Sequence, residues 1–254
     1  MLTKLRPFAR GFLEKASAMF EMYVCALADE DYERAVVKLL DPDGVYFGDD
    51  GERVVSSEEL KRRGMKSLVV IPGAEAAAAA VILDDTDTAW PSVHQDNLIL
   101  VDRYLYFASA ACRRFNHSRL ESLVEQGRDE GEDDGSLAGV LDALRRVHKV
   151  FFDGNCSDVR DAIREVRRQV LHGCTVVFRR SDEGSAVWSL AERFGAVCQV
   201  DVSETATHVV AEHPGTQKAQ WARDNNKFLV NQDWIKAASF RWCRQGERAF
   251  PVLI

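Results

Sequence analysis

Helix-like and strand-like hydrophobic patterns alternate at the start of the chain. Apolar residues recur at three- and four-residue spacing across 7–21, which predicts an amphipathic helix that begins near Pro7 and buries one face. The short apolar run Met22–Leu27 indicates a buried strand. Helical spacing returns over Asp31–Leu40 until the turn residues Asp41–Gly44 end it. Strand alternating with helix predicts an α/β fold with a parallel sheet.

An acidic cluster follows the next predicted strand. Ala79–Leu83 is apolar and leads directly into Asp84–Asp87. In open α/β sheets, ligands gather beyond the carboxyl ends of the strands, where adjacent carboxylates can hold Mg²⁺. The alternative is a plain acidic turn after a strand, which the pattern alone favours. A further strand-rich stretch is predicted over Asn97–Phe107.

A helix with a basic face is predicted after the middle of the chain. Ser157 can cap its N-terminus, and four apolar residues share a buried stripe: Val159, Ile163, Val166 and Val170. Four arginines lie on another face: Arg160, Arg164, Arg167 and Arg168. This face either binds an anionic partner or is a solvated, salt-bridged surface that packs toward the acidic first half. The charge pattern favours the second reading.

The last part of the chain shows a compact pattern the size of one small domain. Strands are predicted over 174–178, 197–200, 207–211 and 228–230, and helices over 185–194, 215–223 and 232–244. Gly195 directly follows a predicted helix, which indicates a left-handed helix end that only glycine adopts cheaply. We expect Trp234, early in the last helix, to lie in the core.

The composition is typical of a soluble globular protein of one to two domains. The 254 residues are 46% hydrophobic and 29% charged, and no stretch resembles a membrane span or a signal peptide, so we expect neither membrane insertion nor secretion. Six scattered cysteines form no CxxC pair, and no histidines cluster beside them to complete a zinc site. They indicate reduced, mostly buried thiols of an intracellular protein.

The net charge of −7 is unevenly distributed, with −9 on residues 1–146 and +2 on residues 147–254. Between the halves, the polar run Arg128–Gly135 contains no apolar residue, which is typical of a solvated connection. A functional role for this acidic run is the alternative.

Short motifs in the second half resemble a BRCT domain in their order and spacing. They are Gly195-Ala196, Thr207-His208-Val209-Val210, Thr216-Gln217-Lys218 and Val230-Asn231-Gln232-Asp233-Trp234-Ile235. The resemblance implies a domain used in nuclear protein assemblies. It further implies a phosphopeptide site at Lys218, with Arg179 in place of the usual hydroxyl residue and Ser181 two positions later. The alternative for Lys218 is a solvated surface lysine.

Motifs in the first half resemble the phosphatases that act on the carboxy-terminal domain of RNA polymerase II, particularly the plant phosphatase-like members. They are Lys4-Leu5-Arg6-Pro7, Leu40-Asp41-Pro42, Ile82-Leu83-Asp84-Asp85, Ala89-Trp90-Pro91, Asn97-Leu98-Ile99 and Tyr104-Leu105-Tyr106-Phe107. Such proteins join a HAD-type catalytic domain to a BRCT domain. The resemblance implies an α/β chain made of an incomplete HAD-like parallel sheet domain over 1–121, an acidic linker and connecting helix over 122–146, a helical lead-in over 147–172 and a BRCT domain over 173–254.

The catalytic nucleophile of that family is absent from these residues. The family's DxDxT motif would lie just before Lys4, so the resemblance implies an N-terminally truncated chain with no catalytic nucleophile. It also implies that the sheet lacks its central strand, between the strands matching Tyr23–Leu27 and Val81–Asp84, which leaves two strand edges unpaired. In an alternative arrangement, Ser67–Ile71 slides into the gap.

The other catalytic positions of the family are only partly retained. Its phosphate-binding hydroxyl residue falls on Ala26, which has no donor. Its phosphate-binding lysine falls on Glu58 or, in a different loop alignment, on Lys61 or Lys66. The resemblance implies Mg²⁺ as the cofactor, and the acidic pair matches its ligands: Asp84 and Asp85, with Asp85 the better match.

Two function classes follow from these residues. One is a protein serine/threonine phosphatase that dephosphorylates the carboxy-terminal domain of RNA polymerase II, an activity that this chain is not expected to perform by itself. The other is a non-catalytic phosphatase-like protein whose BRCT domain binds a nuclear protein or phosphoprotein. Both imply the nucleus, with the phosphorylated polymerase domain or another nuclear protein as partner and no membrane or direct nucleic-acid binding.

Overall fold

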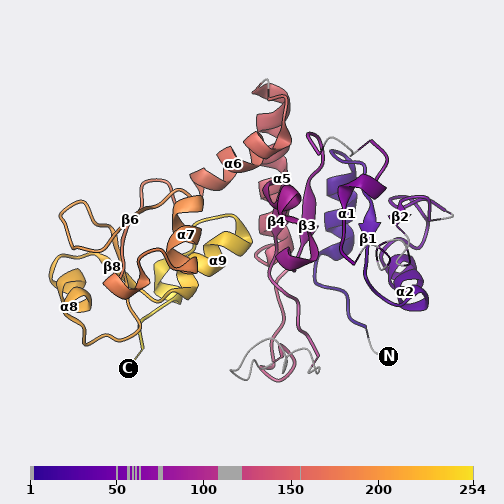
Figure 1. Ribbon diagram of the computed structural model, residues 1–254. Coiled ribbons are helices and arrows are strands. Elements are labelled where there is room, and N and C mark those ends of the chain that lie inside the picture. The colour runs from indigo at the N-terminus through magenta and orange to yellow at the C-terminus, as the bar shows by residue number, and fades with distance from the viewer. Residues whose placement is uncertain are drawn as a thin grey trace. The chain divides into compact units, whose positions relative to one another are not determined.

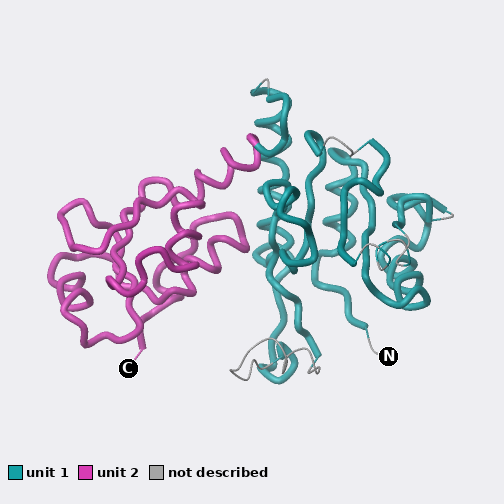
Figure 2. The backbone as a smooth tube through the Cα atoms, viewed as in Figure 1, with its two compact units in different colours: residues 1–160 teal, residues 161–254 magenta. Residues whose placement is uncertain are grey.

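The computed structural model describes residues 3–49, 51–55, 58, 60, 62, 64–73, 77–107, 122–154 and 156–253. The chain divides into two compact units, Met1–Arg160 (unit 1) and Asp161–Ile254 (unit 2) (Figure 1, Figure 2). The predicted division at residue 146 falls inside one helix, α5 (Ser136–Asp153), so the predicted linker and lead-in share a single helix. None of the described helices is long and apolar enough to cross a membrane.

Unit 1 alternates short strands with helices, as the hydrophobic pattern predicts. Its α-helices are α1 (Ala9–Ser17), α2 (Glu30–Leu40), α5 and the start of α6 (Val159–Gln169). Its strands are β1 (Val24–Cys25), β2 (Val54–Val55), β3 (Ile82–Asp84) and β4 (Leu98–Leu100). Three 3₁₀ helices span Leu68–Val70, Asp87–Ala89 and Ser92–Asn97.

The strands of unit 1 form two separate parallel pairs. Among the described residues, β1 pairs with β2 and β3 pairs with β4, and no ladder joins β1 to β3. Strands β1 and β3 nevertheless line the same cavity of about 630 Å³, together with residues of α1 and α5. The separation agrees with the two unpaired strand edges that the family resemblance implies.

The segment Ser67–Ile71 does not enter this gap as a strand. Its centre is the 3₁₀ helix Leu68–Val70, which begins where the Ser67 hydroxyl accepts a hydrogen bond from the backbone N–H of Val69 at 3.3 Å. The Leu68 side chain is buried in a cluster with Ile82, Trp90 and other apolar residues. Packing of Leu68 against β3 and its surroundings therefore outweighs strand formation here.

The strand predicted over 97–107 is shorter in the structure and ends at Leu100. Beyond it, the carbonyls of Leu105 and Tyr106 accept hydrogen bonds from the backbone N–H groups of Leu123 and Val124, both at 3.0 Å. The chain after β4 is therefore paired with a segment near residue 123 instead of extending the sheet.

The acidic run is not a plain solvated connection. Glu130 forms a bidentate ion pair with Arg6, with N–O distances of 2.6 and 2.8 Å. Asp129 pairs with Lys4 and accepts a hydrogen bond from the Tyr104 hydroxyl at 2.9 Å. The prediction from composition was incomplete because it could not anticipate the cations at the start of the chain that these carboxylates meet.

Unit 2 contains one four-stranded parallel sheet and matches the predicted elements closely. In the order β6-β5-β7-β8, its strands are β5 (Thr175–Val177), β6 (Val197–Gln199), β7 (His208–Val210) and β8 (Phe228–Val230). Its α-helices are the rest of α6, α7 (Ala186–Arg193), α8 (Gln217–Asp224) and α9 (Asp233–Arg241), and 3₁₀ helices span Arg180–Asp182 and Glu247–Ala249. Trp234 is fully buried, which confirms its place in the core.

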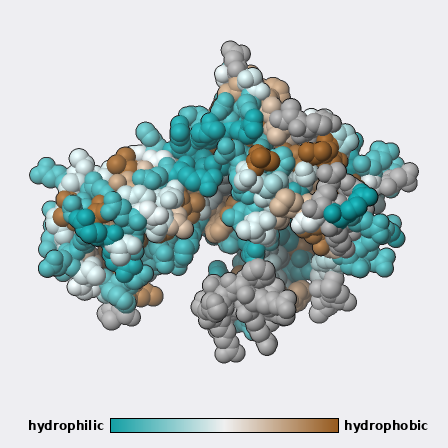
Figure 3. Space-filling view, in the orientation of Figure 1, coloured by the Kyte–Doolittle hydropathy of each residue, from teal (hydrophilic) through white to brown (hydrophobic). Residues whose placement is uncertain are grey.

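The α6 helix confirms the predicted apolar stripe but differs at its cap and on its basic face. Val159, Ile163, Val166 and Val170 are buried. Asp158, not Ser157, precedes the helix and accepts a hydrogen bond from the backbone N–H of Arg160 at 2.9 Å. Arg167 is 6% exposed and lies over the ring of Trp242, so it does not belong to a solvated face. The rest of the visible surface of α6 is hydrophilic (Figure 3).

The described cysteines are free, but fewer are buried than the sequence suggests. Cys174 is buried, three others are half-buried and Cys243 is exposed, while Cys112 lies outside the described residues. The position within an element does not decide their burial, since half-buried Cys198 lies in the middle of the edge strand β6 and buried Cys174 precedes β5.

Candidate functional site

A polar cluster lies at the carboxyl end of β3. Asp84 is the last residue of the strand, and its Oδ2 atom accepts hydrogen bonds from Lys66 Nζ at 2.6 Å and Trp90 Nε1 at 2.8 Å. Its Oδ1 atom accepts from the backbone N–H of Thr86 at 2.9 Å. The Lys66 and Asp84 side chains are 15% and 7% exposed, so each charge depends on the other for its stabilisation.

The same cavity brings the carboxyl end of β1 to this cluster. Cys25 lines the cavity together with Lys66 and Asp84. Burial raises the pKa of the Cys25 thiol to about 11, although the charge of Lys66 lowers it in part. Cys25 is therefore a neutral thiol near pH 7 and not a thiolate nucleophile.

Of the residues that align with the family's phosphate-binding positions, only some offer a suitable side chain at this site. Ala26 follows β1 and offers no side-chain donor, and Glu58 is exposed. Lys61 lies outside the described residues. Lys66, in contrast, lies at the carboxyl ends of β1 and β3. In this arrangement, the Lys66 ammonium donates a hydrogen bond to the Asp84 carboxylate.

The acidic pair does not fit a Mg²⁺ site in this arrangement. Mg²⁺ needs oxygen ligands in near-octahedral geometry. Both oxygens of Asp84 already accept hydrogen bonds, one of them from an ammonium, and Asp85 is exposed, with one oxygen accepting from the Thr86 hydroxyl at 2.7 Å. In the part of the chain that the structure describes, no three His, Cys, Asp or Glu side chains gather as metal ligands. The assignment of Asp84 and Asp85 to Mg²⁺ stays a prediction.

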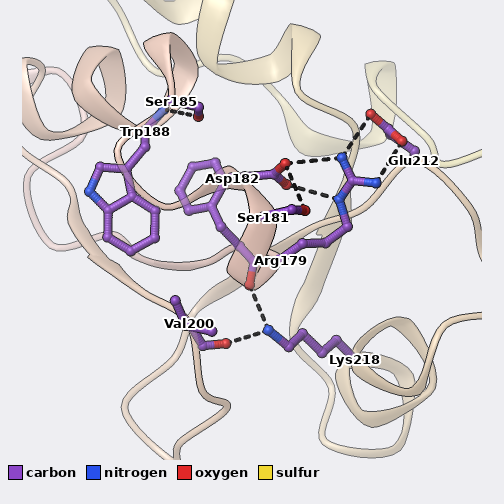
Figure 4. A network of polar contacts seen from close by, with 9 residues as sticks. Arg179, Ser181, Asp182, Ser185, Trp188, Val200, Glu212 and Lys218 are labelled. Atoms are coloured by element: carbon purple, nitrogen blue, oxygen red, sulfur yellow. Dashed lines mark hydrogen bonds and ion pairs between the residues drawn. The ribbon is translucent and has the colours of Figure 1, made fainter.

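A second cluster lies at the carboxyl ends of β5 and β6 in unit 2. Lys218, on α8, donates hydrogen bonds to the backbone carbonyl of Phe178 at 2.6 Å and to that of Val200 (Figure 4). Its ammonium therefore ties together the chain segments that leave two neighbouring strands. Burial lowers the pKa of Lys218.

Arg179 lies beside this position and is held by two carboxylates (Figure 4). Its guanidinium pairs with Asp182 at 2.9 and 3.0 Å and with Glu212 at 2.8 and 3.0 Å. The Ser181 hydroxyl is exposed and directed at Asp182, at 3.4 Å. The structure thus brings Arg179 and Ser181 to the same end of the sheet as Lys218, and the phosphate-binding role of these three residues stays a prediction.

Sequence reasoning missed the partners of these charged side chains. Trp90 and Thr86 hold Asp84, and Asp182 and Glu212 hold Arg179. The three-residue spacing of Arg179 and Asp182 is a signal that could have been used. Glu212 carries no such local signal, because it reaches Arg179 from the chain beyond β7.

Family comparisons assign both halves of the chain. Residues 1–126 match the NLI interacting factor-like phosphatases, and residues 166–238 match the BRCT (BRCA1 C Terminus) domain.

Individual relatives cover nearly the whole chain. RNA polymerase II C-terminal domain phosphatase-like 4 of Arabidopsis thaliana is 45% identical over 99% of this chain and 58% of its own length. Phosphatase-like 3 of the same plant is 37% identical over 99% of this chain and 21% of its length. An RNA polymerase II C-terminal domain phosphatase of Caenorhabditis elegans is 30% identical over 98% of this chain and 40% of its length. This chain therefore spans 58% or less of these relatives.

Solved structures confirm the fold. The fission yeast RNA polymerase II CTD phosphatase Fcp1 bound to beryllium fluoride matches with a TM-score of 0.69 at 23% identity, over 98% of this chain and 80% of that one. A second Fcp1 structure matches with a TM-score of 0.68 at 22% identity over the same shares. The predicted α/β architecture, with a HAD-like part followed by a BRCT domain, is thus confirmed. The chain is similar over nearly its whole length to RNA polymerase II C-terminal domain phosphatase-like proteins, and it joins a domain of the NLI interacting factor-like phosphatase family to a BRCT domain.

Proposed function

We propose that this protein acts in the nucleus on the phosphorylated carboxy-terminal domain of RNA polymerase II. We further propose that the 254 residues bind this phosphoprotein through the BRCT domain without hydrolysing it by themselves. The names of the relatives at 45% and 37% identity support the polymerase domain as the partner. The complete four-stranded sheet of unit 2 supports a working binding module.

The ion pair between Lys66 and Asp84 is the observation that carries the second part of the proposal. Phosphoryl transfer needs an in-line nucleophile and positive charge around the equatorial oxygens of the phosphoryl group. At the carboxyl ends of β1 and β3, Asp84 is engaged by Lys66 and Trp90, and the ammonium of Lys66 is neutralised by the same contact. Neither residue is therefore poised to attack or to stabilise a phosphoryl group.

A protein serine phosphatase is the second candidate, favoured by the position of Lys66. A substrate phosphate entering the cavity would compete with the Asp84 carboxylate for the Lys66 ammonium. In that case Lys66 would bind the phosphoryl oxygens, while Asp84 and Trp90 would orient it. A nucleophile other than the described Cys25 thiol, which is neutral near pH 7, would be required.

Two assays on one preparation separate the candidates. The purified 254-residue chain is mixed with an RNA polymerase II heptad peptide that carries phosphoserine, with Mg²⁺ present, and both binding and phosphate release are measured. We expect binding without turnover above background, since loss of a covalent nucleophile elsewhere costs on the order of a millionfold in rate. Turnover that disappears in the Asp85→Asn variant would establish the phosphatase activity instead. Absence of binding would contradict the proposal that the phosphorylated polymerase domain is the partner.

A further inference from the structure

Strand β1 presents an unpaired edge to the cavity of unit 1. The backbone N–H of Val24 donates to the carbonyl of Arg53 at 2.8 Å, so Val24 directs its backbone groups toward β2. Successive residues of a strand direct these groups to opposite sides, and the N–H and carbonyl of Cys25 therefore point away from β2. Cys25 lines the cavity, and among the described residues these two groups have no hydrogen-bond partner.

Strand β3 presents a second unpaired edge to the same cavity. The carbonyl of Asp84 accepts a hydrogen bond from the N–H of Val101 at 2.9 Å, so Asp84 directs its backbone groups toward β4. The neighbouring residue, Leu83, directs its N–H and carbonyl away from β4, and they meet no partner within the part of the chain that the structure describes. The Leu83 side chain is 37% exposed although it is apolar and belongs to a strand.

The two unpaired edges run in the same direction. Cys25 ends β1 and Asp84 ends β3, and Lys66 donates a hydrogen bond to Asp84 at 2.6 Å. Burial raises the pKa of Cys25, the charge of Lys66 lowers it in part, and the charge of Asp84 raises it again, which agrees with their proximity. The carboxyl ends of β1 and β3 therefore meet at one end of the cavity. Because residues 79–84 all line it, the cavity extends along about six residues of a strand.

The lining of the cavity suits an uncharged, apolar occupant. Lys66 and Asp84 neutralise each other, and Glu21 pairs with Arg53 at 3.4 Å. Apolar side chains of α1, of α5 and of the segments around them line most of the remainder, among them Phe12, Ala16, Phe47, Leu68, Leu144 and Val147. A strand buried inside a parallel sheet carries apolar residues at successive positions, so such a strand matches these walls.

We infer that this cavity binds a strand of a second polypeptide, a run of about six apolar residues that lies between β1 and β3 and parallel to both. Its backbone pairs with Cys25 on one side and with Leu83 on the other, and so joins the two strand pairs into one sheet. The nearby apolar segment 67–71 forms a 3₁₀ helix at its centre, so it does not supply this strand. The inference is independent of phosphopeptide binding by the BRCT domain.

The test adds a synthetic peptide of alternating valine and leucine, with lysines at both ends for solubility, to the full chain. Hydrogen exchange of single backbone N–H groups is followed by NMR. The peptide should slow exchange at Cys25 and Leu83 at least about tenfold and leave Val209, in the sheet of unit 2, unchanged. The matched control peptide is N-methylated at every second apolar residue. It should bind at least about tenfold more weakly, because it cannot donate to one of the two edges.

Two further measurements test the direction and the edge of pairing. A nitroxide at the carboxyl end of the peptide should broaden the amide signals of Cys25 and Asp84 more than those of Met22 and Ala79. Leu83→Pro removes an N–H that faces the cavity and keeps the groups that face β4, so it should also weaken binding at least about tenfold. The N-methylated peptide probes the same hydrogen bonds with the unmodified chain, so the result does not depend on how well this variant folds.

Several results would overturn the inference. Equal binding of the two peptides, with no slowing at Cys25 and Leu83, would show that the cavity takes up apolar groups without backbone pairing. Stronger broadening at Met22 and Ala79 would show an antiparallel strand. Slow exchange at both N–H groups before any peptide is added would show that the chain fills the cavity itself, which contradicts a second polypeptide as the source. Absence of binding contradicts the inference as well, and none of these results bears on the proposed phosphoprotein binding.

Discussion

Gly195 packs directly against the backbone of Arg168. A side chain at Gly195 would place its Cβ atom 1.8 Å from the carbonyl oxygen of Arg168, far inside van der Waals contact. The glycine also has φ +98°, in the left-handed region. It ends α7, where its N–H donates to the carbonyl of Glu192 at 3.0 Å, and so turns the chain into β6 against α6.

Gly195→Ala should destabilise unit 2 by about 3 kcal/mol or more, because left-handed strain of about 1–2 kcal/mol adds to a clash with backbone that cannot move away. Gly184→Ala is the matched control, since Gly184 has φ +70° but nothing within 4 Å of the added Cβ. It should cost only the conformational strain, about 1 kcal/mol. Urea unfolding followed by tryptophan fluorescence measures both, and equal costs would contradict the clash.

The two units should differ in their ability to fold alone. Residues 147–254 hold a complete parallel sheet and should show a cooperative thermal transition and dispersed amide resonances. Residues 1–146 should show neither, because two separate strand pairs flank a cavity of about 630 Å³ and two-stranded sheets are marginal.

Because α5 extends to Asp153, the fragment 1–160 provides the control for a cut through that helix. A sharp transition in 1–160 but not in 1–146 would assign the instability to loss of the end of α5. A sharp transition in both would show that the unpaired strand edges do not prevent folding.

The buried ion pair in unit 1 should matter far more than an exposed one. Lys66→Met leaves the Asp84 carboxylate, 7% exposed, without its counter-charge and should cost about 3 kcal/mol of unfolding free energy. Arg34→Ala removes a pair with Glu30 of similar length, 2.7 Å, whose side chains are 70% and 66% exposed, and should change stability by less than about 0.5 kcal/mol. Lys66→Met combined with Asp84→Asn should recover part of the loss in urea unfolding. No recovery in the double variant would contradict the role of the unpaired charge.

His208 should make unit 2 sensitive to mild acid. The imidazole is fully buried between the rings of Phe228 and Trp234. Burial lowers the pKa of His208, the hydrogen bond to Glu247 raises it in part, and the charge of Arg244 lowers it further. The folded state thus binds this proton less readily than the unfolded state.

With a folded-state pKa below the unfolded value of 6.5, the stabilisation is present above pH 6.5 and is lost as the pH falls. The slope should reach at most about 1.4 kcal/mol per pH unit. Urea unfolding of the 147–254 fragment between pH 7.5 and 5 measures it, with His213→Gln, at an exposed position, as the control. If His208→Phe keeps the acid sensitivity of the unmodified fragment, another group is responsible.

Local patterns in the sequence were sufficient for most of unit 2. The periods of apolar residues and the cap and turn residues place its strands and helices to within a few residues, because each signal acts through the backbone of its own neighbourhood. The same reasoning found the α6 stripe and the glycine at the end of α7. In unit 1 it found β1, β3 and β4 but not the two-residue strand β2. It overestimated the length of β4, since Leu105 and Tyr106 pair with a segment that no local pattern connects to them.

The sequence by itself determined most of the order of elements, the two-domain organisation and the family motifs that identify them. Only the tertiary structure decided which charges meet. Lys66 and Asp84 are 18 residues apart, Arg179 and Glu212 are 33 apart, and Lys4 and Asp129 are 125 apart. A chain with 40 acidic and 33 basic residues offers many alternative pairs of similar local character. The choice among them depends on which segments the core packing brings together, and that packing depends on contacts across the whole unit.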